Sequence, residues 1–397
     1  MADCTCQTSS AKCARHDAPP TLPLSQKLSF LGYVFFLVIP RTILNATTAT
    51  ITVFRRGLPL RKYLTSAFLG ASLLHLKPGH IQYASPTSRQ VYRAFMTSML
   101  SKAQRRGQTD LVASLQTDTQ PLPVGDASLL WMGSRKTARK FVLFFHGGGY
   151  VAPLMPGHVE WCWRVFVAPH IGTPNEVAVA MLDYTLCPAA QYPTVLKQAV
   201  AALESLLASG VRPDQIVVGG DSAGGNLTAH LLRHLLRPEP HAPPVHLAQP
   251  LLGAFLVSPW LTSDIAQVAM VENNGVDMIC PRHIGLTTYH FYGAQPLPKD
   301  EDLVHGTESA YDNLASVVGD VYVTAGQQEV LRDQAVMWVD KVRRRNAGLK
   351  IELAVARDEG HDFILLEGDQ QQTGPAMERM KAWSLDLIQG EGQKGKP

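Results

Sequence analysis

The chain has 397 residues, 46% of them hydrophobic and 17% charged, which is enough apolar material for one large core or two modest ones. Its formal net charge of +3 is a mild excess, and no basic stripe alternates with aromatic residues, so nucleic acid is not an expected partner. The six cysteines do not form a disulfide framework, and Cys4, Cys6, Cys13 and His16 fit no usual zinc spacing.

The N-terminal region combines a polar tail with an apolar segment. Residues 1–27 are rich in Ser, Thr, Pro and Cys, which predicts a disordered tail. Residues 28–54 are apolar but are interrupted at Pro40 and Arg41. A tilted or kinked membrane anchor is the favoured interpretation, and a helix or hairpin lying on the bilayer is the second. A cleaved signal peptide is the least favoured, because its n-region would be unusually long.

Basic residues around this segment indicate its orientation. More of them follow it than precede it, which weakly favours a cytoplasmic main body. They are Arg55, Arg56, Arg61 and Lys62 after the segment, against Arg15 and Lys27 before it.

Residues 55–109 are predicted to be helical. The stretch that begins at Ser88 carries apolar residues at helical spacing, and Gly107 is expected to end the helix. From about residue 110 to 390, short apolar runs alternate with helical patterns, which predicts an α/β domain with a mostly parallel sheet and helices on both faces. The runs are 128–132, 140–145, 176–182, 215–220, 253–258, 320–325 and 351–356. Residues 262–313 break this rhythm and are interpreted as an insertion that forms a lid together with 55–109.

A nucleophile is predicted at Ser222. The sequence GDSAG (220–224) follows an apolar run and precedes an amphipathic helical stretch, and this is the strand, sharp turn and helix of a nucleophile elbow. A capping serine in a glycine-rich turn is the alternative. In this architecture the acid and then the histidine follow along the chain.

His361 is the expected base, because it lies in a short loop after the last predicted strand. The acid is expected in the loop GQQEVLRDQ after the preceding strand. Glu329 is favoured there because it is closer to the strand end, and Asp333 is the alternative. Asp358 and Glu359 are too close to His361 in the chain to be suitable.

The stretch FFHGGGY (144–150) places three glycines after a strand. Attack on an ester creates an oxyanion, which backbone N–H groups can stabilise where no side chain blocks the approach. Gly147, Gly148 and Ala223 are the predicted donors, and His146 is predicted to be a structural hydrogen-bonding residue.

The combination of HGGG, GDSAG, a carboxylate and GHDF resembles the hormone-sensitive-lipase-like group of α/β-hydrolases over residues 110–390. That group includes microbial esterases, arylacetamide deacetylases and fungal steryl acetyl hydrolases. The resemblance implies an eight-stranded α/β-hydrolase sheet. Matching its D-P-L-x-D motif to EVLRD also implies Glu329 as the acid. The apolar N-terminal segment looks like the anchor of the deacetylase members, which implies membrane association and suggests the endoplasmic reticulum.

The resulting hypothesis is a serine carboxylic-ester hydrolase that uses Ser222, His361 and Glu329 and needs no metal or cofactor. The expected substrate is a lipophilic small-molecule ester with a short acyl group. Tyr150, Trp161, Trp163 and Trp260 are candidates for lining its pocket. A pathway-specific biosynthetic hydrolase or cyclase is the main alternative, and a non-catalytic receptor on the same scaffold is a further one.

Overall fold

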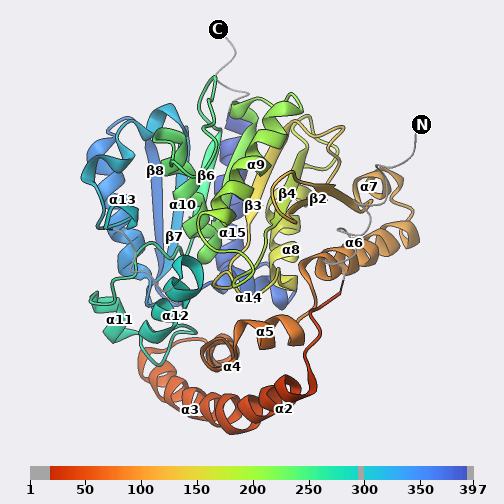
Figure 1. Ribbon diagram of the computed structural model, residues 1–397. Coiled ribbons are helices and arrows are strands. Elements are labelled where there is room, and N and C mark those ends of the chain that lie inside the picture. The colour runs from red at the N-terminus through yellow and green to blue at the C-terminus, as the bar shows by residue number, and fades with distance from the viewer. Residues whose placement is uncertain (1–17, 294–298, 391–397) are drawn as a thin grey trace, which may run out of the picture.

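The computed structural model describes residues 18–293 and 299–390, and its centre is an eight-stranded sheet (Figure 1). The strand order is β1-β2-β4-β3-β5-β6-β7-β8, and β2 runs antiparallel to both of its neighbours while all other pairings are parallel. The strands are β1 (Asp118–Pro121), β2 (Ser128–Met132), β3 (Lys140–Phe145), β4 (Val177–Asp183), β5 (Ile216–Asp221), β6 (Gly253–Val257), β7 (Asp320–Gly326) and β8 (Lys350–Ala356). The prediction of a mostly parallel sheet is confirmed, and β1 is the strand that the apolar runs did not include.

The helices precede the sheet, connect its strands and follow it. The N-terminal ones are α2 (Leu24–Tyr33), a π-helical turn (Val34–Val38), α3 (Ile39–Arg56), α4 (Leu60–His75), α5 (Pro78–Ala84), α6 (Ser88–Arg105) and α7 (Thr109–Ser114). Within the sheet domain follow α8 (Pro156–Cys162), α9 (Thr194–Ala208), α10 (Ala223–Leu236), α11 (Val268–Glu272), α12 (Pro281–Tyr292), α13 (Arg332–Arg345), α14 (Phe363–Asp369) and α15 (Pro375–Gln389).

Alternation along the strands divides the core into two layers. Leu129, Leu143 and Val218 face one side, where they pack with side chains from α9, α10 and α13. Their neighbours Leu130 and Val142 face the other side, where α6, α8 and α15 cover the sheet. Because both faces are covered there, β2 to β7 are buried at nearly every position, as the continuous runs predicted.

The helices before the sheet divide into two groups. Helix α6 begins with a capping box, in which Thr87 and Gln90 exchange hydrogen bonds, and it packs on one face of the sheet. It therefore lies against the core, although the sequence predicts that residues 55–109, which include this helix, belong to the lid. Helices α2 to α5 instead lie across the edge where the parallel strands end, below the sheet in Figure 1.

Residues Leu24–Arg56 form one continuous helix of 33 residues, which starts inside the tail predicted over 1–27. By length and composition alone this helix could cross a membrane, which is weak evidence for a span. It lies along α4 at the foot of the molecule (Figure 1). The rest of the predicted tail up to residue 17, with the four residues considered for zinc, lies outside the described part of the chain.

Candidate active site

The predicted nucleophile lies at a strained turn between β5 and α10. Ser222 has φ 51° and ψ −113°, a conformation that is unfavourable for a residue with a side chain. Strand β6 and the loop after it hold it there, because its N–H donates to Val257 O at 2.9 Å and its carbonyl accepts from Trp260 N at 3.1 Å. A Cβ on Gly220 or on Gly224 would lie within 2.0 Å of Phe145 O, so both glycines are required for the turn to pass β3.

The structure brings His361 to this serine. Its Nε2 atom lies 2.9 Å from Ser222 Oγ, although 139 residues separate the two in the chain. The side chain is 3% exposed, and burial lowers the pKa of His361 to about 3. The resting imidazole is therefore neutral and can accept the hydroxyl proton.

Of the two candidate acids, only Glu329 lies beside this histidine. Glu329 is fully buried, and its Oε2 atom lies 3.9 Å from His361 Nδ1, which is longer than a hydrogen bond. Among the described residues, His361 Nδ1 and Glu329 Oε1 have no hydrogen-bond partner, while Oε2 accepts from Ser258 Oγ at 2.6 Å. Burial, together with the nearby charge of Asp277, raises the pKa of Glu329 to about 8.

Asp333 lies elsewhere, in the first turn of α13. Its Oδ2 atom accepts from the backbone N–H of Ala269 at 2.8 Å, and its Oδ1 atom accepts from Arg332 Nε at 2.8 Å. Asp333 therefore supports the segment after β6 rather than the histidine.

Gly147 does not have the position predicted for an oxyanion donor, and this part of the prediction is wrong. Its N–H donates to the buried carboxylate of Asp221 at 3.1 Å, and the residue does not line the cavity that contains Ser222. Gly148, Gly149 and Ala223 line that cavity, and no hydrogen bond within the described residues occupies their N–H groups. Gly148 and Gly149 have φ values of 99° and 60°, which favour glycine. The hydrogen bond of Gly147 depends on Asp221, which no local pattern reveals.

His146 is buried in a structural role. Its Nδ1 atom lies 2.8 Å from Gly147 O, and its ring stacks on Tyr184 with the centroids 4.3 Å apart. Burial lowers the pKa of His146 to about 3.

Two carboxyl groups near His361 were not predicted. Asp277, from the insertion after β6, accepts from the backbone N–H of His361 at 3.0 Å and from that of Val330 at 2.8 Å. Asp362 follows the histidine with φ 52°, and its Oδ2 atom lies 3.2 Å from His361 Nε2. Burial raises the pKa of Asp277 to about 7 and that of Asp362 well above its usual range. Only the adjacency of Asp362 to His361 could have indicated either residue in advance.

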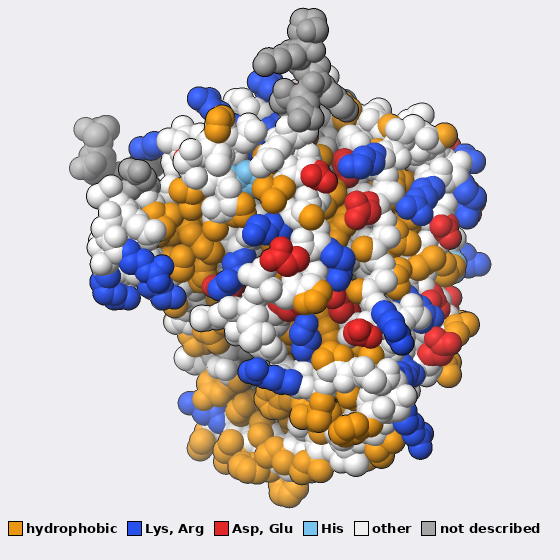
Figure 2. Space-filling model, turned by 180° about the vertical axis from the view of Figure 1, so that it is seen from behind, with side chains coloured by type: hydrophobic (Ala, Val, Ile, Leu, Met, Phe, Trp, Pro, Cys, Tyr) orange, Lys and Arg blue, Asp and Glu red, His pale blue; other side chains and the backbone are white. Residues whose placement is uncertain are grey.

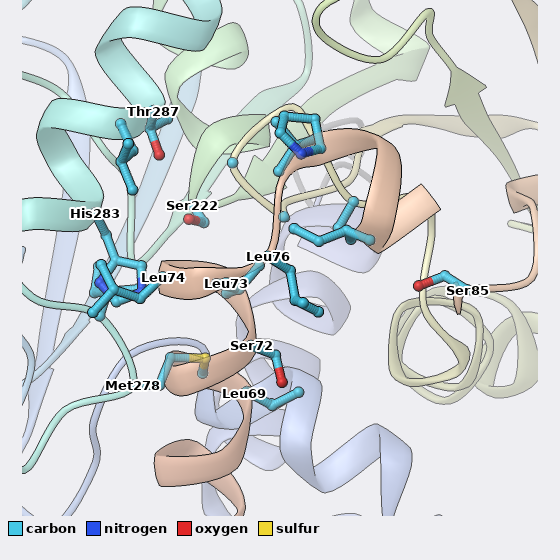
Figure 3. A pocket seen from close by; sticks show the side chains of 18 of the residues that line it. Leu69, Ser72, Leu73, Leu74, Leu76, Ser85, Ser222, Met278, His283 and Thr287 are labelled. Carbon is cyan, nitrogen blue, oxygen red and sulfur yellow. The ribbon is translucent and has the colours of Figure 1, made fainter. Parts of the chain in front are cut away.

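A cavity of about 690 Å³ opens above Ser222 and His361. Figure 3 shows Ser222 between Leu73 and Leu76, at the end of α4 and just after it, and Thr287 of α12. The walls are mostly apolar and come from α2, α4, α5 and α12. Of the four predicted aromatic residues, only Trp260 lines this cavity; Tyr150 hydrogen-bonds Asn226, and Trp161 and Trp163 belong to the core layer under α8.

Comparisons with known proteins agree with this architecture. A family model described as the alpha/beta hydrolase fold matches residues 142–365. The chain is 34% identical over 108 residues to Lipase 2 of Moraxella sp. strain TA144, covering 26% of this chain and 24% of that protein. It is 25% identical to the ethyl acetate hydrolase of Pseudomonas putida, covering 77% of this chain and 91% of that protein.

Among solved structures, carboxyl esterase 2 of Tuber melanosporum aligns with a TM-score of 0.56. The identity is 19%, and the alignment covers 69% of this chain and 87% of the esterase chain, which supports the fold alone. The family match and a hormone-sensitive lipase among the relatives confirm the resemblance that was identified from the motifs.

Proposed function

Because the chain belongs to the alpha/beta hydrolase fold family, we propose that it is a serine hydrolase of carboxylic esters. The observation that carries this proposal is the 2.9 Å contact between Ser222 Oγ and His361 Nε2 at the floor of an apolar cavity. A serine at an ordinary glycine-rich turn would have no such partner. The names of the relatives, lipase and ethyl acetate hydrolase, support the same class of reaction.

In the proposed reaction, Ser222 Oγ attacks the acyl carbon of the ester while His361 Nε2 takes the hydroxyl proton. The negative charge that forms on the carbonyl oxygen is stabilised by the N–H groups of Gly148, Gly149 and Ala223. His361 then gives its proton to the leaving alcohol as the C–O bond breaks. Water, deprotonated by the same imidazole, releases the acid from the serine and restores Ser222.

Glu329 is the proposed acid of this triad. When His361 is protonated on both ring nitrogens, an ionised Glu329 stabilises this imidazolium and fixes its orientation. The 3.9 Å separation between Oε2 and Nδ1 has to shorten by roughly 1 Å for a direct hydrogen bond to form. Catalytic hydrogen bonds commonly tighten in this way when substrate binds.

The lining of the cavity supports a lipophilic ester as substrate. Leu69, Leu73, Val151, Ile284 and Leu365 are among its walls, and a volume of about 690 Å³ is ample for a drug-sized molecule. The acetate hydrolase among the relatives supports a short acyl group, with the larger part of the cavity holding the alcohol portion. We also propose that the protein associates with a membrane through the region around residues 28–54.

Labelling with a fluorophosphonate probe tests this function directly, because such probes react only with activated serines. We expect one labelled peptide, which contains Ser222, and hydrolysis of p-nitrophenyl acetate that stops in proportion to labelling. A folded protein that the probe does not label would instead be a receptor on a hydrolase scaffold, and the proposal would fail.

A further inference from the structure

One long helix forms part of the wall of the cavity at the candidate active site. We call Leu24–Arg56 the strap helix; it comprises α2, the π-helical turn and α3. Phe30, Tyr33, Val34 and Val38 on its inner face line the same cavity as Ser222 and His361. Its C-terminal end is fixed to the sheet domain, because the guanidinium of Arg56 donates to Glu272 O at 2.7 Å and to Asn273 Oδ1 at 2.9 Å.

The outer face of the strap helix is an exposed apolar surface. Of the nineteen exposed large hydrophobic residues in the described part of the chain, thirteen lie on this helix or on the adjacent α4. Phe36 is 80% exposed, Phe54 74% and Ile43 63%. Figure 2 shows this surface as a hydrophobic lobe at the foot of the molecule. A contiguous patch of this kind on a soluble domain indicates an interaction surface.

Charges within the segment that carries this surface have a single sign. The sequence contains no Asp or Glu from residue 18 to residue 109, whereas Lys27, Arg41, Arg55 and Arg61 are exposed on or beside the strap helix. Apolar side chains flanked by basic ones fit the boundary between acyl chains and anionic headgroups of a lipid bilayer.

A span across the bilayer fits the same helix less well. At 1.5 Å per residue, 33 residues extend about 50 Å, well beyond the roughly 30 Å of a hydrocarbon core. Arg41 is exposed near the midpoint, where a span would bury its charge in lipid. The inner face would also have to leave the cavity that it lines. If the helix lies in the plane of the membrane surface, Arg41 stays exposed and the inner face of the helix continues to line the cavity.

We propose that the strap helix lies in the plane of an anionic lipid surface and that the ester substrate reaches Ser222 from the bilayer, past this helix. The proposal rests on the hydrolase function for the identity of the substrate, but the placement of the helix does not depend on it. The cavity then opens directly behind the lipid-facing surface, so a lipophilic ester does not need to pass through water.

Flotation of the full-length protein with vesicles tests the surface. We expect binding to phosphatidylcholine vesicles that contain 25% phosphatidylserine and at least tenfold weaker binding to phosphatidylcholine alone. F36D/I43D should lower binding to the anionic vesicles at least tenfold, whereas the matched F36L/I43L variant should bind as the wild type does. Neither residue lines the cavity, so hydrolysis of water-soluble p-nitrophenyl acetate should be unchanged in both variants.

That soluble assay separates the two proposals, because loss of acetate hydrolysis concerns the active site and loss of flotation concerns the surface. For the acetate ester of a long-chain alcohol, dissolved in the vesicles, F36D/I43D should lower kcat/KM about tenfold. Wild-type protein that does not float, or that forms a dimer which F36D/I43D dissociates, would overturn the proposal by assigning the surface to a second copy.

Epitope tags at both ends distinguish an in-plane helix from a span. In sealed microsomes, protease added outside should digest both tags or protect both, because the N-terminal tag and the body lie on one side. Digestion of one tag with protection of the other would show that the helix crosses the membrane and would overturn the in-plane placement.

Discussion

Asp277 connects the two loops that carry the candidate base and acid, since its carboxylate accepts a hydrogen bond from the backbone N–H of His361 at 3.0 Å. The other carboxylate oxygen accepts from Val330, the neighbour of Glu329. A residue of the insertion between β6 and β7 thus sets the relative position of His361 and Glu329 without contacting a reacting atom.

Replacement of Asp277 should affect catalysis through this connection. We expect D277N, which retains one acceptor, to lower kcat about threefold to tenfold, and D277A to lower it further, because a buried N–H group is left unpaired. D277N also removes a charge that raises the pKa of Glu329, so the midpoint of the pH profile should move to lower pH. An unchanged midpoint, measured as kcat/KM against pH, would indicate a merely structural role.

Replacement of the serine gives the largest expected effect. S222A should lower hydrolysis of p-nitrophenyl acetate by at least about 1,000-fold, because no other group can form the acyl intermediate. S72A is a matched control, since Ser72 lines the same cavity but donates its hydroxyl to Phe68 O. Equal rates for S222A and S72A, in proteins with unchanged circular dichroism, would exclude the proposed nucleophile.

A pair of isosteric variants distinguishes between the two candidate acids, Glu329 and Asp333. E329Q should lower kcat about 100-fold or more, because a neutral amide cannot stabilise the imidazolium. D333N should change kcat less than about threefold, since Asp333 hydrogen-bonds Ala269 rather than the histidine. Steady-state kinetics on both variants measures this difference, and a larger loss in D333N would reverse the assignment.

Burial of Glu329 should reduce the stability of the folded protein as pH rises. Its pKa is about 8 in the folded state and about 4.5 when exposed, so between these values the folded protein binds a proton that the unfolded chain does not. The contribution of Glu329 to the free energy of unfolding should therefore fall by up to about 1.4 kcal/mol per pH unit from pH 4.5 to pH 8. E329Q lacks this dependence, so urea denaturation should find it more stable than the wild type at pH 8, with a difference that shrinks towards pH 5.

The same carboxyl group predicts the pH dependence of activity. His361 stays neutral down to a pKa of about 3, so the rise of kcat/KM with pH should follow ionisation of Glu329, with a midpoint near 8. A midpoint near 6.5, the usual pKa of histidine, would mean that the imidazole titrates as if it were exposed.

Filling the cavity should change the preference for ester size. L73W places a larger side chain in the wall beside Ser222 (Figure 3) and should lower kcat/KM for esters with a large alcohol portion at least tenfold, while ethyl acetate is affected little. L64W is the control, because Leu64 is 40% exposed on the same helix and does not line the cavity. A uniform loss across an ester panel would indicate general disruption rather than a filled pocket.

The features that the sequence predicted well depend on local patterns. The apolar runs located seven of the eight strands, because strands covered on both faces need apolar residues at almost every position. The turn at Ser222 was predictable because the contacts of Gly220 and Gly224 with Phe145 leave no room for a side chain. β1 was missed because its residues, DTQP, are polar and lie at the edge of the sheet.

The features that were missed depend on contacts between distant segments. Gly147 is turned away from the cavity by a hydrogen bond to Asp221, 74 residues away. Asp277 lies 84 residues before the His361 N–H that it binds, in a segment without a recognisable motif. Helix α6 has the same amphipathic pattern as a lid helix, and only the tertiary structure decides that it packs on the sheet.

Part of the cavity wall beside Ser222 comes from the helix that carries most of the exposed large hydrophobic side chains in the described part of the chain. Residues before Arg56 would commonly be deleted to obtain material that stays in aqueous buffer. Such a shortened enzyme would lack the wall formed by Phe30, Tyr33, Val34 and Val38, and water would enter beside Ser222. Its rates and substrate preferences would then describe a wider cavity than the one in the 397-residue chain.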